Sequence, residues 1–89
     1  MISVIYLVIT SPSGVVWEGN VDSISSKNRE GFFDILPDHA RFISLVSGHR
    51  IFIELSSSTK KEFLFQSAVL FFEDNKATIY VQDILDLTQ

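Results

Sequence analysis

Cysteine is absent from this sequence, glycine and proline are scarce, and acidic residues outnumber basic ones. Without cysteine the chain has no disulfide framework and no thiolate zinc site, and it fits a reducing compartment. Seven basic residues against eleven acidic ones give a formal net charge of -4, which opposes binding to the phosphates of nucleic acids. The four glycines form neither a P-loop nor a G-x-G-x-x-G motif, so a glycine-rich phosphate site is not expected.

Hydrophobic residues, in contrast, make up 46% of the 89 residues, and eight of them are phenylalanines. This is enough apolar material for the core of one small domain, and we predict that residues 1–89 form a single domain. The apolar segment from Met1 to Ile9 lacks the basic region and small-residue cleavage site of a signal peptide, and it is too short to cross a bilayer. We therefore predict that it is a strand.

Short apolar runs separated by turn residues predict strands along the whole chain, because no segment has the i, i+3, i+4, i+7 spacing of an amphipathic helix. Only the tail, residues 83–89, is expected to form a helical turn. The expected strands cover residues 2–10, 15–25, 32–36, 41–46, 50–55, 62–66, 69–73 and 76–82. About eight to ten short strands at this spacing predict an all-β fold, a small antiparallel β-sandwich or barrel.

The aromatic residues at strand spacing are predicted to fill the core from two facing sheets. They are Phe63, Phe65, Phe71 and Phe72. Residues 4–9 and 69–72 are apolar on both alternating faces, which is more hydrophobic surface than one small core uses. We therefore expect an exposed apolar patch, and such patches mark partner surfaces. An aromatic platform for single-stranded nucleic acid is the alternative, and the acidic charge opposes it because such platforms line basic grooves.

The two histidines are the first candidates for chemistry. His39 follows Asp38, and His49 lies in the next predicted turn. A metal site needs about three protein ligands with supporting groups, and no third ligand accompanies this pair. We interpret His39 as a loop histidine that bonds to nearby backbone groups. No G-x-S-x-G motif occurs, so neither an enzyme with a serine nucleophile nor a cofactor is expected.

The most distinctive segment is Gly31 to Ala40, which leaves a strand through two phenylalanines, stops at Pro37 and continues into an Asp-His loop. It follows the segment Leu7 to Gly19, which contains a Pro-Ser-Gly turn, and the segment Val21 to Ile24. In this order and spacing, from about Leu7 to Val81, the chain resembles the amino-terminal β-sandwich of the epsilon subunit of F-type ATP synthase.

The resemblance implies an antiparallel sandwich of about ten strands at the foot of the central stalk. Such a domain binds the gamma subunit and the c ring and passes ring rotation to the catalytic head, so the implied role is a rotor subunit and not an enzyme. It implies a peripheral position at the cytoplasmic face of the energy-transducing membrane, with membrane association only through the complex. The alternative is a small β-barrel that binds oligosaccharide or single-stranded nucleic acid, which requires a polar, aromatic-lined groove.

The resemblance also implies which residues bind partners. His39 marks the loop near gamma, and Phe32 stands where some relatives carry an acidic residue that faces the polar loops of the c ring. If ring contact is electrostatic, Glu30 or Asp34 supplies it. The predicted partner-binding residues are Glu30, Phe32, Phe33, Asp34, Asp38, His39, Arg41 and Phe42.

The chain departs from the family pattern at several of these positions. The family often has glycine at Asp34, proline at Arg41 and a Gly-Gly pair at Ser67 and Ala68. The Cβ atoms at Ser67 and Ala68 hinder a very close backbone approach, so a different local bulge is expected. The resemblance stops before the helical hairpin of many relatives, and neither nucleotide binding nor the inhibitory role of that hairpin is assigned.

Overall fold

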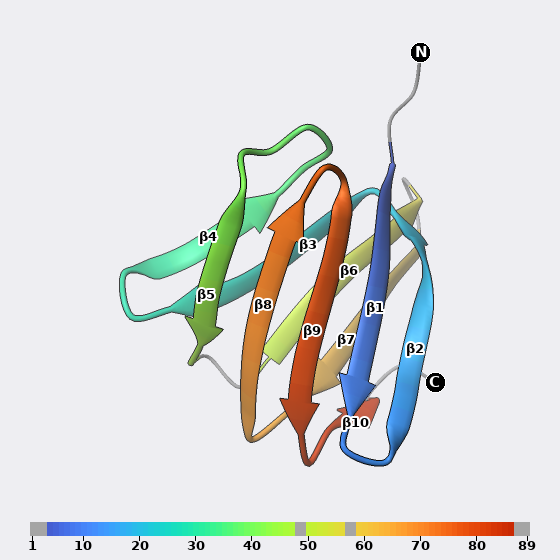
Figure 1. Cartoon of the computed structure of the whole chain (residues 1–89), viewed down its shortest axis with the longest axis vertical. Helices are drawn as coiled ribbons and strands as arrows, with labels where there is room; N and C mark the ends of the chain where they lie inside the picture. Colours follow the sequence, from blue (N-terminus) through green and yellow to red (C-terminus); the bar gives the residue numbers. More distant parts are fainter. Residues whose placement is uncertain (1–3, 48–49, 57–58, 87–89) are drawn as a thin grey trace.

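The computed structural model describes residues 4–47, 50–56 and 59–86. In these ranges every helix or strand position belongs to a strand, ten strands in all, and no helix long enough to cross a membrane is found there. The strands form two five-stranded sheets packed face to face (Figure 1). The predicted all-β sandwich of eight to ten strands is confirmed.

Sheet A has the strand order β2-β1-β9-β8-β5, and sheet B has the order β10-β7-β6-β3-β4. Neighbouring strands are antiparallel except β1 and β9, which are parallel. The strands of sheet A are β1 (Ile5–Ser11), β2 (Gly14–Val21), β5 (Phe42–Val46), β8 (Ser67–Glu73) and β9 (Lys76–Gln82). Those of sheet B are β3 (Ser23–Asn28), β4 (Gly31–Ile35), β6 (Arg50–Ser56), β7 (Thr59–Leu64) and β10 (Leu85–Asp86).

The core lies between the two sheets and follows the alternation of side chains along each strand. The buried hydrophobic residues are Ile5, Leu7, Ile9, Val21, Ile24, Ile35, Val46, Ile51, Ile53, Phe63, Phe65, Ala68, Leu70, Phe72, Ala77, Ile79 and Val81. Three of the four predicted core phenylalanines are among them. Phe71 is 42% exposed, and its prediction was wrong because adjacent residues on β8 point to opposite faces, so only Phe72 points inward.

The strand predicted over residues 15–25 is two strands in different sheets. β2 ends at Val21 in sheet A, and β3 begins at Ser23 in sheet B, with the N–H of Asp22 donating to the carbonyl of Glu54 over 2.6 Å. Val21 and Ile24 are both buried although they are three residues apart, which a single straight strand does not allow. The change of sheet at Asp22 therefore resets the alternation.

Two predicted loops are shorter than expected. The polar break at residues 26–31 is only the Arg29-Glu30 turn, because Lys27 and Asn28 pair with β4. The solvated loop expected at residues 56–61 ends earlier, since β7 starts at Thr59. The predicted helical turn in the tail is wrong at residues 85–86, which pair with β7 as strand β10. The predictions for His49 and for residues 2–3, 57–58 and 87–89 lie outside the described residues.

The Pro-Ser-Gly turn is confirmed, and the residues of the other turns suit their backbone conformations. Ser11 and Gly14 pair across the β1–β2 connection, and Gly14 has a φ of 129°. Gly31 closes the β3–β4 turn with a φ of 125°. Asp74 and Asn75 form the β8–β9 turn with φ values of 53° and 60°, the left-handed conformation that Asp and Asn tolerate.

Candidate partner-binding surfaces

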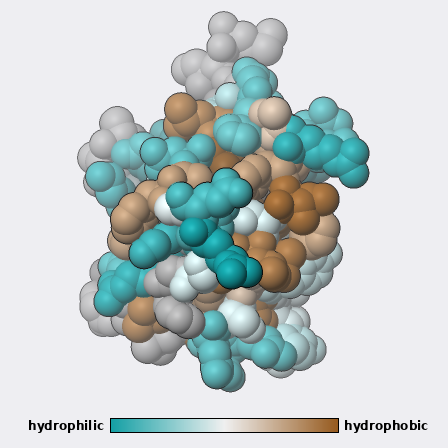
Figure 2. Space-filling view, turned by 90° about the vertical axis from the view of Figure 1, so that its left-hand side faces the viewer, coloured by the Kyte–Doolittle hydropathy of each residue, from teal (hydrophilic) through white to brown (hydrophobic). Residues whose placement is uncertain are grey.

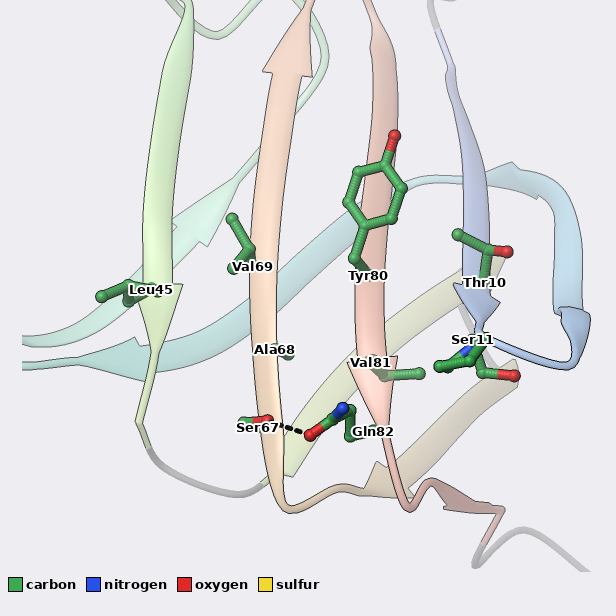
Figure 3. A pocket seen from close by; sticks show the side chains of 10 residues that line it. Thr10, Ser11, Leu45, Ser67, Ala68, Val69, Tyr80, Val81 and Gln82 are labelled. Atoms are coloured by element: carbon green, nitrogen blue, oxygen red, sulfur yellow. Dashed lines mark hydrogen bonds between the residues drawn. The ribbon is translucent and has the colours of Figure 1, made fainter.

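The outer face of sheet A carries a row of mostly apolar side chains across all five strands. The pairing register places Leu45 beside Val69, Val69 beside Tyr80, Tyr80 beside Thr10 and Thr10 beside Val15. Figure 3 shows four of these side chains on neighbouring strands. Leu45 is 69% exposed, Val15 58% and Tyr80 53%, so the row lies on the solvent side of the sheet. The predicted exposed apolar patch is confirmed.

A second row lies beside the first. Ile43 pairs with Phe71, Phe71 with Thr78, and Thr78 with Val8. Ile43 is 56% exposed, and the ring of Phe71 contacts that of Tyr80 edge on, with the centroids 5.7 Å apart. The two rows therefore form one apolar surface, which we call the sheet A face.

The sheet A face is hollowed near the end of β1. The depression has a volume of about 540 Å³. Polar groups lie at one end, where the Ser67 hydroxyl donates to Gln82 Oε1 over 3.4 Å (Figure 3). The depression is lined by Thr10, Ser11, Pro12, Leu45, Ser67, Ala68, Val69, Tyr80, Val81 and Gln82. The strand register is regular through Ser67 and Ala68, with no bulge between them.

The far end of the sheet A face is bordered by charged groups. Arg41 lies 3.9 Å from Glu73, and Lys76 pairs with Glu73 across the β8–β9 ladder. Tyr6 donates a hydrogen bond to Glu18, and this bond, together with some burial and the carboxylate charge, raises the pKa of the Tyr6 phenol above its ordinary value of 10.0. An apolar centre with a polar border is the usual composition of a protein interface.

The outer face of sheet B is more polar. Ser25 donates to Asp34, and Arg50 pairs with Glu62. Phe52, 43% exposed, is its main apolar group on the central strand β6. The two outer faces of the sandwich thus differ in chemistry, and sheet A has the face suited to burial against another protein.

Three predicted site residues share the outward side of the β3–β4 hairpin. Phe32 is 84% exposed, and the Lys27 ammonium lies 5.4 Å from its ring centroid. Asp34 points outward from the same strand, and Glu30 lies exposed in the preceding turn, where its N–H donates to the Asn28 side chain. Figure 2 views the molecule from the β4–β5 side, where hydrophobic groups lie between hydrophilic ones. The hairpin is therefore a second surface, separate from the sheet A face.

Two predicted site residues, Phe33 and Phe42, instead point toward the interior. Both are half-buried and pack against the core, with their ring centroids 5.1 Å apart. They join β4 of sheet B to β5 of sheet A at the side of the sandwich. Their main role is therefore to stabilise the fold. Their exposed neighbour Phe32 does not share this role.

The remaining predicted residues lie in the β4–β5 loop or at its end. The Nδ1 atom of His39 is 2.7 Å from the carbonyl oxygen of Ala40, and its ring packs edge on against Phe42 and Phe72 at 5.8 and 5.9 Å. This confirms the interpretation of His39 as a loop histidine bonded to nearby backbone. Asp38 bonds to Asn75, and Arg41 reaches Glu73. Within the described ranges no three His, Asp or Glu side chains gather as a possible metal site.

The sequence analysis missed the exposed members of the sheet A face, among them Leu45, Tyr80 and Ile43. Each lies in an apolar run, where inward and outward residues look alike. It also missed Asn75 as a partner of Asp38, because nothing in the sequence links two polar turn residues that are 37 positions apart.

Residues 4–86 match the family described as the ATP synthase, Delta/Epsilon chain, beta-sandwich domain. The ATP synthase epsilon chain of a Nitratiruptor species is 32% identical over 81 residues, which are 91% of this chain and 63% of that relative. The epsilon chain of a Sulfurovum species is 28% identical over 82 residues, 92% of this chain and 64% of the relative. The chain thus spans less than two thirds of these relatives.

Solved structures show the same fold. A chain in the Euglena gracilis mitochondrial ATP synthase (OSCP/F1/c-ring, rotational state 1) superposes with a TM-score of 0.88 at 16% identity, covering 98% of this chain and 56% of that chain. A chain in the Tetrahymena thermophila mitochondrial ATP synthase (central stalk/c-ring) gives 0.76 at 17% identity, covering 92% and 66%. Because the family match covers residues 4–86, nearly the whole length of the chain, the chain belongs to the ATP synthase delta/epsilon chain β-sandwich family.

Proposed function

We propose that this domain belongs to a non-catalytic epsilon-type rotor subunit in the central stalk of an F-type ATP synthase. In this role it binds the gamma subunit and the c ring and couples ion-driven rotation to ATP synthesis. Its place is the cytoplasmic face of the energy-transducing membrane, held there through the complex. Family membership supports the assignment, and the single observation that carries it is the pair of distinct outward surfaces on one packed body.

The sheet A face is the proposed surface for gamma. One of its rows crosses all five strands and the other crosses four, and Arg41 and Glu73 border the face at the end where the β4–β5 loop lies. Apolar residues at the centre of an interface supply most of the binding free energy, while polar residues at the rim give specificity. The loop residues His39 and Arg41 extend this surface toward the sandwich end, and Asp38 holds the loop through its bonds to Asn75.

The outward side of the β3–β4 hairpin is the proposed surface for the c ring. Phe32 projects from it beside Lys27, and Asp34 and Glu30 supply carboxylates. The Asp34 carboxylate already accepts a hydrogen bond from Ser25, so Glu30 is the carboxylate better placed to meet a polar loop of the ring. Contact there combines one exposed aromatic ring with one acidic side chain.

The two sheets provide the mechanical link between these surfaces. The chain crosses between the sheets after β2, β4, β5, β7 and β9, and the closely packed core resists sliding of one sheet over the other. At the β5 side Ser47 N–H donates to the Lys27 carbonyl over 2.9 Å, and Asn28 donates to the Ser44 hydroxyl over 3.1 Å. These bonds connect the hairpin directly to β5, so a torque applied to the hairpin is transmitted to sheet A.

The test is co-purification of the chain with gamma from the same source. Leu45→Lys places a charge at the centre of the sheet A face, where the side chain is 69% exposed, so the fold is retained. Phe52→Lys makes the same kind of change on sheet B and is the matched control. We expect Leu45→Lys to weaken gamma binding at least about tenfold and the control to leave it unchanged. Equal binding by both variants would contradict the proposed gamma surface.

A further inference from the structure

Asn75, in the turn between β8 and β9, joins three segments of the chain. Its side-chain amide donates to Asp38 Oδ1 over 2.9 Å, and its Oδ1 atom accepts the backbone N–H of Asp38 at 2.6 Å. Its backbone carbonyl accepts the N–H of Tyr6 at 2.9 Å, at the start of β1. A single side chain therefore fixes the β4–β5 loop to the end of the inner strands β8 and β9 of sheet A through two reciprocal bonds.

Asp38 and Asn75 both have the left-handed backbone conformation, with φ values of 68° and 60°. Aspartate and asparagine tolerate this conformation better than other residues with a Cβ atom, and glycine adopts it most easily. Glycine would satisfy the backbone at either position, but at position 75 it would remove both hydrogen bonds and at position 38 the bond that the Asn75 amide donates. Asp38 and Asn75 thus provide both the left-handed backbone conformation and the hydrogen bonds between the two turns.

The reciprocal bonds bear directly on what the loop presents. His39 follows Asp38, and its ring packs against Phe42 and Phe72. Arg41 reaches Glu73, two residues before Asn75. The Asp38–Asn75 contact therefore acts together with the contacts of His39 and Arg41 to hold the loop at this end of sheet A.

We infer that Asp38 and Asn75 form a side-chain clamp that holds the β4–β5 loop in the shape it presents to a partner. Ordering a loop before binding lowers the entropy cost of association, so the clamp raises affinity without contacting the partner itself. The clamp is a property of the isolated chain, and only its effect on affinity rests on the proposed function. Both residues are positioning residues.

The clamp predicts coupling between two glycine substitutions. Asp38→Gly and Asn75→Gly each keep a residue suited to the left-handed turn. Asn75→Gly breaks both bonds, whereas Asp38→Gly breaks only the side-chain bond, because the backbone N–H at position 38 remains. We expect Asn75→Gly to raise the unfolding equilibrium constant about fivefold and Asp38→Gly about twofold to threefold, measured by urea unfolding with Trp17 fluorescence, and the double variant to exceed Asn75→Gly alone only slightly. Factors that multiply would overturn the clamp. Asp74→Gly is the control, because Asp74 shares the turn and has a φ of 53°. Its effect should multiply with that of Asp38→Gly.

Exchanging the two side chains tests the chemistry of the contact. Asn75→Asp alone places two carboxylates within hydrogen-bond distance, whereas combining it with Asp38→Asn restores one amide and one carboxylate with their roles reversed. The ring-proton shifts of His39 report the loop position, because aromatic rings lie against it. We expect the single variant to move these shifts toward those of an exposed histidine and the exchange to restore them. No recovery in the exchanged variant would refute the clamp.

Binding to gamma separates the two proposals. If the glycine pair is coupled in the isolated chain but wild type does not bind gamma, the clamp stands and the proposed partner fails. If wild type binds, we expect Asn75→Gly to weaken binding about threefold to tenfold and Asp74→Gly to leave it unchanged. Equal binding by wild type and Asn75→Gly would overturn the effect of the clamp on affinity.

Discussion

The adjacent residues Phe32 and Phe33 give the most direct test of how β4 is placed. Phe32 is 84% exposed, whereas Phe33 is half-buried against the core and pairs with Phe42. Replacing a fully buried phenylalanine by alanine costs about 3–5 kcal/mol. Because Phe33 keeps some solvent contact, we expect Phe33→Ala to lower the free energy of unfolding by about 2–3 kcal/mol, including the loss of its ring pair.

Phe32→Ala removes a ring of the same size from the opposite face of the strand. It loses only the contact with Lys27, so we expect a change of less than about 0.5 kcal/mol. For a chain of this length the Phe33 variant should melt roughly 10 °C or more below wild type, and the Phe32 variant close to it.

Urea unfolding followed through Trp17, the only tryptophan, measures both changes. Trp17 packs against the core and therefore reports global unfolding. The double variant Phe33→Ala with Phe42→Ala should show a coupling of about 0.5–1.5 kcal/mol between the two rings. Equal costs for Phe32→Ala and Phe33→Ala would refute the inward and outward assignment along β4.

Three further predictions address the backbone, the core and pH. Gly31→Ala should lower the melting temperature by several degrees, because a φ of 125° is strained for alanine even though the added Cβ would meet no atom within 4 Å. An unchanged melting temperature would contradict this. Ser26→Ala should cost about 1–2 kcal/mol in urea unfolding, since Ser26 is 3% exposed and donates to the Arg50 carbonyl over 2.6 Å; no measurable cost would show that this bond is replaced. Folding raises the pKa of Tyr6, so its stabilising bond to Glu18 is fully present below the unfolded pKa of about 10 and is lost as pH rises through the folded value. Ultraviolet titration should show this pKa returning toward 10.0 in Glu18→Gln, and an unchanged titration would argue against the bond.

Where one face of a strand is apolar and the other polar, the sequence predicted the structure well. In the strand predicted over residues 50–55, Ile51 and Ile53 are buried and alternate with Arg50, Phe52 and Glu54 on the outer face. The turn that ends at Gly14 was predicted for a similar reason, because glycine accepts positive φ. Local chemistry determined both features.

The sequence-based predictions failed where two alternative structures have the same local chemistry. Phe71 and Phe72 are identical residues on adjacent positions, and only the packing of β8 decides which one is buried. The change of sheet at Asp22 depends on the Glu54 carbonyl, which is distant in the chain. Contacts between segments that are remote in the sequence leave no repeating pattern of residues in it, and so they could not be predicted.

The candidate site was predicted in part for the same reason. The segment from Glu30 to Phe42 was identified as a unit, but the structure divides it into an outward hairpin, an inward aromatic pair and a clamped loop. Alternation along β4 separates Phe32 from Phe33, and a remote turn residue fixes Asp38. The exposed patch was expected from residues 4–9 and 69–72, but its members on β2, β5 and β9 were not predicted, since they come from other strands.

The measurement that tests the central claim most directly is whether this chain bridges gamma and the c ring. Tagged gamma is mixed with purified c ring, with and without the chain, and the ring recovered with gamma is quantified. We expect ring recovery to require the chain, to fall with Leu45→Lys through loss of gamma, and to fall with Phe32→Ala through loss of the ring. A folded chain that binds neither protein, or that binds each only in the absence of the other, would contradict the coupling role.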